Sequence, residues 1–463
     1  MKKKKTKAPE GALKQRKGGD DTLMKAFLAF FAINTVVCYI FAMISRGDTW
    51  TMTLFYPDPN PKDHFMDFFN SMRDAGTRDV YVERGVIYPP LANLLFFIAS
   101  KVVSPEVIST PFRYRHIMSV DQMSMMLYVF YAAAMLLCMY ELVRHYLATR
   151  DQKRYAVIFA ACMLICYPTM YCLERGNITM LSMILSMVFL FCRNSKNNAV
   201  RELSYVCLAL AAGIKIYPAL YGILLLFEKK YKDAARLVLY GVICFFLPFA
   251  FYGGVSGALQ LVENIRTFTA VIKSGFVIDS VSVENLCYNF GLENPMIGKG
   301  IFALTELLAV GSTFLLKKQW QKVTMLTYVI LNIQSTSSYY AMVFMIIPFV
   351  LFLVENKGKK LVAVDWIYWF CFSFFITQIP TLYHFVGTDV MFNFFYNVMG
   401  TMYSEKINQF VSLYLFQMLF ILLLLEAFWA GVTTLRAKLK NKKARAVPAE
   451  APAGEELHAE GAV

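Results

Sequence analysis

Ionisable and amide side chains that interrupt aromatic or apolar stretches are the residues of this sequence best suited to chemistry. Polar groups inside a membrane are expensive and are kept mainly where they act. The first is Asp67, which lies in residues 64–69 (HFMDFF) and is followed by Tyr81 and by Tyr88, which opens a Tyr-Pro-Pro sequence. Aromatic residues on both sides of Asp67 predict a partly desolvated carboxylate, which can accept a proton.

Three further polar groups interrupt later apolar stretches. Lys215 lies in the middle of the stretch 203–227, in a Lys-Ile-Tyr-Pro sequence that includes Tyr217. A lysine so far from either end of a span is expected to face a polar cavity or an anionic ligand. The second group is Arg175 and Asn177 on either side of Gly176, which could also be a simple tight turn. The third is the run 332–340 with Ser338, Tyr339 and Tyr340, which could also be a polar connector between two spans.

The elements that must position these groups are apolar helices. The chain is 57% hydrophobic and 17% charged, whereas soluble domains average about 45–50% apolar and about 25% charged residues. This composition excludes a disordered chain and an ordinary soluble enzyme. It predicts an all-α polytopic membrane protein with about 10–12 transmembrane helices, from apolar segments near 24–45, 87–103, 120–143, 155–173, 177–193, 203–227, 236–252, 300–316, 323–335, 338–354, 362–380 and 409–432.

The net charge of +14 is placed where it orients such helices. Basic clusters fill the two ends of the chain and the short loops, and Lys and Arg beside a span favour the cytoplasmic side. We therefore expect no nucleic-acid partner and a multi-pass protein of the cell membrane with both termini in the cytoplasm. The predicted parts are a cytoplasmic basic tail at 1–23, a transmembrane catalytic domain at 24–432, outer loops at 46–86 and 253–299, and a disordered cytoplasmic tail at 433–463.

Two topologies remain open at this level. If every apolar segment crosses, the basic loop from Arg144 to Arg154 lies outside, against the charge rule. If 87–103 only dips into the membrane and 203–227 is a broken hairpin around Pro218, that loop lies inside. Proline beside polar groups makes broken helices that line a cavity plausible in both segments. Within the first outer loop, the spacing of Phe65, Phe68, Phe69 and Met72 predicts a short helix on the membrane surface.

The order of these groups resembles the GT-C glycosyltransferases of family 87, which include polyprenol-phosphate-mannose-dependent mannosyltransferases. More distantly, it resembles the catalytic subunit of the first GPI mannosyltransferase. The shared pattern is an acid and a Tyr in the first outer loop, Tyr-Pro-Pro, a Gly-Asn turn, Lys-x-Tyr-Pro, and a Ser-aromatic pair, over roughly residues 60–350. The GPI enzyme has Asp-x-Asp in its first loop, whereas residues 65–67 read Phe-Met-Asp here, which disfavours a two-carboxylate metal site.

The resemblance implies a GT-C-like bundle whose active site faces away from the cytoplasm. It implies transfer of a hexose, with mannose the expected sugar, from a polyprenyl-phosphate sugar to a glycolipid or glycan acceptor with inversion. Asp67 then serves as general base, and Lys215 or Arg175 stabilises the departing phosphate. The remaining expected donor or acceptor contacts are Tyr88, Asn177, Tyr217, Glu284, Asn285, Ser338, Tyr339 and Tyr340.

Other interpretations of the sequence are possible. No metal-ligand spacing occurs among the ten Cys and five His, so we expect no cofactor and no metal site, although a divalent metal stays open. A transporter or flippase would share the broken helices and the intramembrane Lys, but it would usually show internal repeats. A polymerase or ligase of envelope polymers would also use lipid-linked sugars, but its main functional loop usually comes late in the chain.

Overall fold

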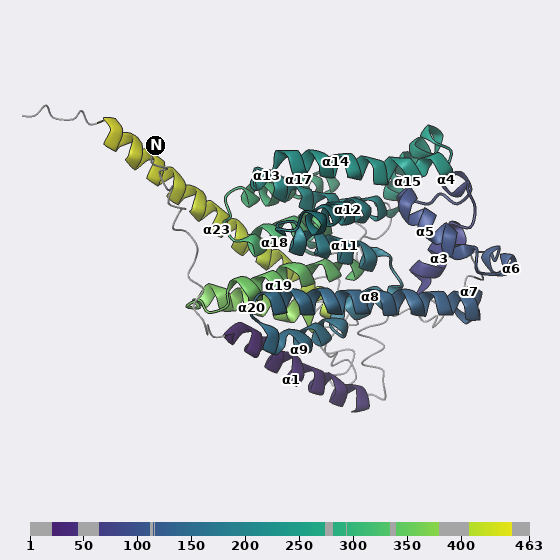
Figure 1. Ribbon diagram of the computed structural model, residues 1–463, viewed down its shortest axis with the longest axis horizontal. Coiled ribbons are helices and arrows are strands. Elements are labelled where there is room, and N and C mark those ends of the chain that lie inside the picture. Colours follow the sequence, from purple (N-terminus) through teal and green to yellow (C-terminus); the bar gives the residue numbers. More distant parts are fainter. Residues whose placement is uncertain are drawn as a thin grey trace, which may run out of the picture.

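The computed structural model describes residues 21–44, 64–111, 114, 116–273, 281–292, 294–333, 339–378 and 407–446. The tail before residue 21, residues 46–63 of the first outer loop, Ser338 and the residues after Ala446 therefore lie outside the described parts. Throughout those parts the regular elements are helices (Figure 1). The prediction of an all-α polytopic membrane protein is confirmed.

Six helical segments are long and apolar enough to cross a membrane on their own. They are α1 (Thr22–Ile44), α8 (Gln122–Thr149), α9 with α10 (Lys153–Arg175), α14 with η3 (Tyr231–Phe251), most of α17 (Pro295–Thr313) and the middle of α23 (Ile407–Ala446). The total of ten to twelve crossings stays a prediction. Because α23 continues to Ala446, the prediction of disorder is wrong for residues 433–446.

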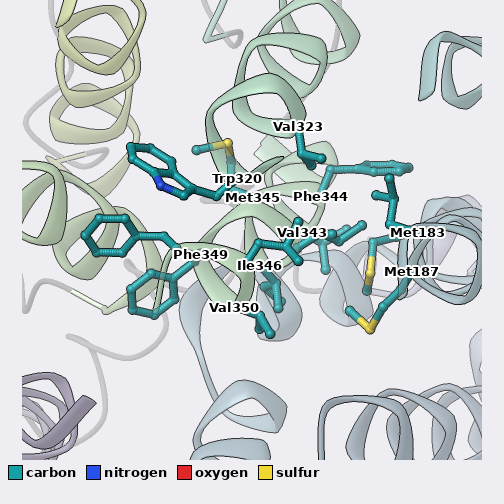
Figure 2. Packing of buried hydrophobic residues seen from close by; sticks show 14 of the residues in the cluster. Met183, Met187, Trp320, Val323, Val343, Phe344, Met345, Ile346, Phe349 and Val350 are labelled. Atoms are coloured by element: carbon teal, nitrogen blue, oxygen red, sulfur yellow. The ribbon is translucent and has the colours of Figure 1, made fainter. Parts of the chain in front are cut away.

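Shorter helices fill the interior between these segments. Figure 2 shows how residues 343–346 of η4 (Tyr339–Met345) and α19 (Ile346–Glu355) pack between Met183 and Met187 on one side and Trp320 on the other. All of these side chains are fully buried. The neighbouring interior helices are α11 (Thr179–Cys192), α12 (Asn198–Ile214), α13 (Ile223–Phe227), α18 (Gln319–Asn332) and α20 (Ala363–Ile376).

The first outer loop and its neighbours form a cap at one end of the bundle. In Figure 1 these elements lie opposite the end at which α23 protrudes. The cap comprises α3 (Met66–Asp74), α4 (Val80–Glu83), α5 (Pro90–Ser100), α6 (Pro105–Ile108), α7 (Ile117–Val120) and α15 (Val255–Lys273). The predicted short helix is α3, but its apolar face does not lie on a membrane surface. Met66, Phe69 and Met72 are fully buried in a cluster that includes Phe96 of α5 and Tyr128 of α8.

The basic loops gather at the opposite end of the bundle. Asp21, just before α1, accepts a hydrogen bond from Gln152 (3.3 Å) and lies 3.9 Å from Lys357. Lys357 also lies 3.3 Å from Asp151 in the turn between α8 and α9. The turn between α8 and α9 is therefore at the same end as the start of α1, which the charge distribution favours.

The segments 87–103 and 203–227, which left the topology open, explain why the turn between α8 and α9 lies at the same end as the start of α1. Helix α5 has eleven residues, about 16 Å of helix, which is too short to cross a core of about 30 Å. The segment 203–227 is a hairpin: α12 ends where Lys215 becomes extended (φ −139°, ψ 124°), and η2 (Tyr217–Gly222) and α13 return. Glu228, just after α13, pairs with Arg193 at the end of α11 (3.0 Å). The version with a dipping segment and a hairpin thus agrees with the structure.

Candidate active site

A tight backbone contact joins the start of α3 to the turn between α10 (Tyr167–Arg175) and α11. The amide of Phe65 donates to the carbonyl of Glu174 (2.8 Å). Gly176 ends α10 with φ +67°, and a Cβ there would lie only 2.8 Å from the carbonyl oxygen of Phe65. Glycine is needed both for the left-handed backbone and for this close approach. The predicted turn therefore also docks the first outer loop.

The docking brings Asp67 onto this turn. Asn177 donates from Nδ2 to Oδ2 of Asp67 (2.8 Å), and Arg175 Nη2 lies 3.2 Å from Oδ1. Both carboxylate oxygens are therefore held by residues about 110 positions further along the chain. The Asp67 side chain remains 23% exposed, so a substrate hydroxyl can reach it. The predicted association of Asp67 with aromatic groups also holds, because Phe68 and Phe69 on the same helix are buried.

The orientation of the Asn177 amide is fixed by its other hydrogen bonds. Its Oδ1 accepts from the backbone amide of Thr179 (3.0 Å) and from the Thr179 hydroxyl (2.7 Å). A backbone amide can only donate, so Oδ1 faces α11 and Nδ2 must face Asp67. The carbonyl of Asn177 accepts from the hydroxyl of Tyr131 on α8 (3.1 Å). These contacts hold Asn177 in one rotamer as a donor to the carboxylate.

Tyrosines and Lys215 form the side of the site next to Asp67. The Lys215 ammonium lies 4.0 Å from the ring centre of Tyr88 and 5.9 Å from that of Tyr340, which is the range of cation–π attraction. The hydroxyl of Tyr217 lies 3.2 Å from that of Thr179. Four of the predicted residues, from the start of the segment 87–103, the α12 hairpin and η4, therefore lie close together.

Tyr88 is a neutral hydroxyl in this setting. Burial raises its pKa well above the ordinary value, and the nearby Asp67 carboxylate raises it further. Its hydroxyl lies 3.4 Å from Nδ2 of Asn177. The backbone carbonyl of Tyr88 is held by the Tyr81 hydroxyl (3.0 Å) and by Nδ2 of Asn93 (3.2 Å). Tyr88 therefore stays protonated at neutral pH and can offer a hydrogen bond to a ligand.

Several contributors were missed from the sequence. Asn93, Tyr131 and Thr179 hold Tyr88 and Asn177, and His64 binds Glu174 through Nδ1 and Oε1 (2.9 Å). Asn93 has a detectable signal, since it is an amide inside the apolar segment 87–103. Tyr131 and Thr179 have none, because a tyrosine and a threonine are ordinary in a membrane helix.

Other predicted residues make contacts with different elements. The ring centre of Tyr339 lies 6.4 Å from that of Tyr171 on α10. Glu284 and Asn285 lie on α16 (Val283–Asn289). That helix is anchored elsewhere, because the amide of Val283 donates to Asn332 (2.7 Å). The substrate contacts of Glu284 and Asn285 stay predictions, as does that of Ser338, which lies outside the described residues.

The described part of the chain contains no cluster of three or more His, Cys, Asp or Glu side chains that could hold a metal ion. Asp67, the carboxylate of the site, is held by an amide and a guanidinium instead. Arg175 and Lys215 supply positive charge to the same region. The arrangement thus offers a partly exposed proton acceptor in Asp67, positive charge from Arg175 and Lys215, and the neutral hydroxyl of Tyr88.

An apolar groove of about 390 Å³ runs beside this site. It lies between α12, η2, α13 and α14, and Ile216 in its wall directly follows Lys215 in the chain. Its lining is almost entirely aliphatic or aromatic and includes Leu208, Ala212, Ile223, Val242 and Phe245. A hydrocarbon chain fits this lining, and the groove is linked to the site through Ile216, the chain neighbour of Lys215.

Comparison with known families agrees with this chemistry. Residues 87–285 match the model of glycosyltransferase family 87. The match contains Tyr88, Arg175, Asn177 and Lys215, whereas Asp67 precedes it. No curated protein gives a significant match. The family match, on a chain with six helices suited to crossing a membrane, indicates a membrane glycosyltransferase.

Proposed function

We propose that this protein is an inverting glycosyltransferase that moves a hexose, mannose in the first instance, from a polyprenyl-phosphate carrier to a glycolipid or glycan acceptor. The observation that carries the proposal is the Asp67 carboxylate, held through both oxygens by Asn177 and Arg175 and adjoined by Lys215. The match to glycosyltransferase family 87 supports the reaction type.

The proposed reaction needs one base and a stabilised leaving group. Asp67 accepts the proton of the acceptor hydroxyl while that oxygen bonds to the anomeric carbon of the sugar. The bond between this carbon and the phosphate oxygen breaks, and its electron pair leaves with the phosphate. Attack from the face opposite the phosphate inverts the anomeric centre. Arg175 and Lys215 stabilise the negative charge, because cations in a partly dehydrated site act strongly on it.

The donor class is supported by the surface beside Lys215. A polyprenyl phosphate joins an anionic head to a long hydrocarbon chain. The head suits Lys215, and the chain suits the apolar groove whose wall includes Ile216. A water-soluble nucleotide sugar would have no use for such a groove. We therefore propose that the isoprenoid chain lies in the groove and the phosphate beside Lys215.

The proposed orientation places the site outside the cytoplasm. The basic loops gather at the end of the bundle where α1 begins, and α3, the helix that carries Asp67, lies in the cap at the other end (Figure 1). Because basic loops favour the cytoplasmic side, the cap faces outward. An acceptor lipid in the outer leaflet would approach Asp67 from this side.

The test compares two aspartates of the same helix. Asp67 and Asp74 are 23% and 24% exposed, but Asp74 pairs with its neighbour Arg73 (2.6 Å) rather than with the turn at Gly176. Membranes with each variant are supplied with radiolabelled polyprenyl-phosphate mannose and a crude acceptor-lipid extract. Asp67→Asn should lower turnover by about 10²–10⁴-fold, the usual effect of losing a general base. Asp74→Asn should be at least about tenfold milder.

Two outcomes would contradict the proposal. If Asp67→Asn keeps more than about a tenth of wild-type turnover, the base is another group. If wild-type membranes transfer no label from polyprenyl-phosphate mannose, the donor is wrong, and polyprenyl-phosphate glucose is the next donor to supply.

A further inference from the structure

A second carboxylate, that of Glu174, lies near the Asp67 carboxylate that we propose as the base. Glu174 is 4% exposed, and its Oε1 is bound by Nδ1 of His64 (2.9 Å), which is itself 36% exposed. The other oxygen, Oε2, has no hydrogen-bond partner among the described residues. A buried carboxylate depends strongly on each donor it has. His64 is therefore a principal support of the Glu174 charge.

Glu174 and Asp67 both act on the same guanidinium. Arg175 directly follows Glu174 in the chain and places Nη2 3.2 Å from Oδ1 of Asp67. Glu174 also interacts electrostatically with Arg175 and with Asp67. Among the described residues, Tyr128 of α8 is a further polar group that Glu174 acts on. Two carboxylates thus compete for one arginine, and His64 satisfies one of them.

We propose that His64 is a positioning residue, which occupies Glu174 and thereby leaves Arg175 on Asp67. This inference rests on the function proposed above and extends it to the regulation of the same site. Two neighbouring contacts support it, one from the backbone of Phe65 and one from the side chain of His64, and both reach Glu174. His64 lies immediately before Phe65, whose amide donates to the carbonyl of Glu174 (2.8 Å). The backbone contact and the side-chain contact therefore form together when the loop docks.

The consequence is that removing the His64 side chain harms Asp67 indirectly. Glu174 then loses its hydrogen-bond donor and draws the Arg175 guanidinium toward itself. Asp67 keeps Asn177 but loses its ionic partner, so its carboxylate is less well held for the acceptor hydroxyl. Donor binding, which we assign to Lys215 and the apolar groove, is not affected.

The experiment is a double-mutant cycle on purified protein in detergent with polyprenyl-phosphate mannose. His64→Ala should lower kcat roughly tenfold, the size of coupling expected for residues in one ionic network. The KM for the donor should stay within about twofold of wild type. Glu174→Gln alone removes the competing charge and should keep kcat within about threefold of wild type.

The decisive variant combines both changes. His64→Ala with Glu174→Gln should recover kcat to within about threefold of wild type, because no carboxylate then competes for Arg175. His64→Gln, which keeps a donor for Glu174, should also stay near wild type. A residue with a merely structural role would not be rescued by changing Glu174. Should the double variant be as slow as His64→Ala alone, the inference is wrong.

Two controls keep the result interpretable. Thermal midpoints of all variants are measured in the same detergent, and if His64→Ala aggregates, His64→Leu takes its place with the same expectation. Wild type and Asp67→Asn are assayed beside them. An inactive wild type refutes the proposed function, whereas an active, Asp67-dependent wild type with unaffected His64 variants refutes only the inference.

Discussion

Replacing Asn177 with Asp is the most specific test of the way in which Asp67 is held. The substitution is nearly isosteric, and the remaining oxygen still accepts from Thr179, so the turn is kept. The amide that donates to Asp67 over 2.8 Å becomes a second carboxylate oxygen. A favourable contact is thus converted into a repulsive one without a change in shape.

The magnitude follows from the distance. Two unit charges 2.8 Å apart repel by about 6 kcal/mol at an effective dielectric constant of about 20. The pair relieves this repulsion by sharing a proton between the two carboxylates. A carboxylate that already shares a proton cannot accept one from the acceptor hydroxyl. We expect kcat to fall by about 10²-fold or more.

The comparison is with Asn177→Ala, which removes the donor but adds no charge. Losing one hydrogen bond to a charged group costs about 1.5–3 kcal/mol, and Arg175 remains in place, so Asn177→Ala should be clearly milder. A matched control is Asn194→Asp at the basic end, where Asn194 donates to Glu228 (3.3 Å) in an exposed setting. Its kcat should stay within about twofold of wild type, because exposed charge pairs are screened.

The assay measures kcat and the donor KM of each variant, with thermal midpoints to confirm folding. The reasoning is refuted if Asn177→Asp is as active as Asn177→Ala. The amide would then not face the Asp67 carboxylate, or that carboxylate would not be the base.

Three further outcomes are expected. Lys215→Met should weaken donor binding about tenfold or more in a binding assay while the protein stays folded; unchanged affinity would mean that Lys215 holds no phosphate. Gly176→Ala should lower both kcat and the thermal midpoint, because a left-handed Ala costs about 1–2 kcal/mol and its Cβ meets backbone at 2.8 Å. Gly85→Ala has a similar φ of +61° with open space around it, and a loss as large as that of Gly176→Ala would argue against the docking contact. On a Cys-free background, a Cys at Glu83 should react with an impermeant thiol reagent from outside, and one at Lys232 only after permeabilisation; the reverse pattern would invert the proposed orientation.

Much of the fold was readable from the sequence, because membrane helices are set by local composition. Apolar stretches of sufficient length form helices wherever they occur, since a backbone in lipid must satisfy its own hydrogen bonds. The break at Lys215 was also visible, because Pro218, three residues after Lys215, cannot continue a helix through its own position and disfavours a helical Tyr217. Gly176 was recognisable as a turn residue for the same local reason.

The partners of the polar residues were not readable in this way. The sequence signals that a buried charge such as Arg175 or Lys215 needs compensation, but many acids are equally available to it. Asp67 lies 110 residues before Asn177, and only the docking of α3 on the turn at Gly176 brings these two side chains together. The membrane-surface position of α3 was wrong for a related reason. An amphipathic pattern predicts that the apolar face of a helix is shielded from water, and tertiary packing decides whether lipid or protein shields it.

The choice between the two topologies also depended partly on the sequence and partly on tertiary contacts. The distribution of Lys and Arg along the chain favoured one of them, since charge beside a span acts through its sequence position. Whether 203–227 crosses once or turns back is decided by a tertiary contact. Glu228, just after this segment, pairs with Arg193, 35 residues earlier, so the segment returns to the end of the bundle where it began. The sequence by itself determined which segments are helices and which residues are costly to bury. Tertiary structure decided which of those residues meet, because their contacts form only when distant helices pack together.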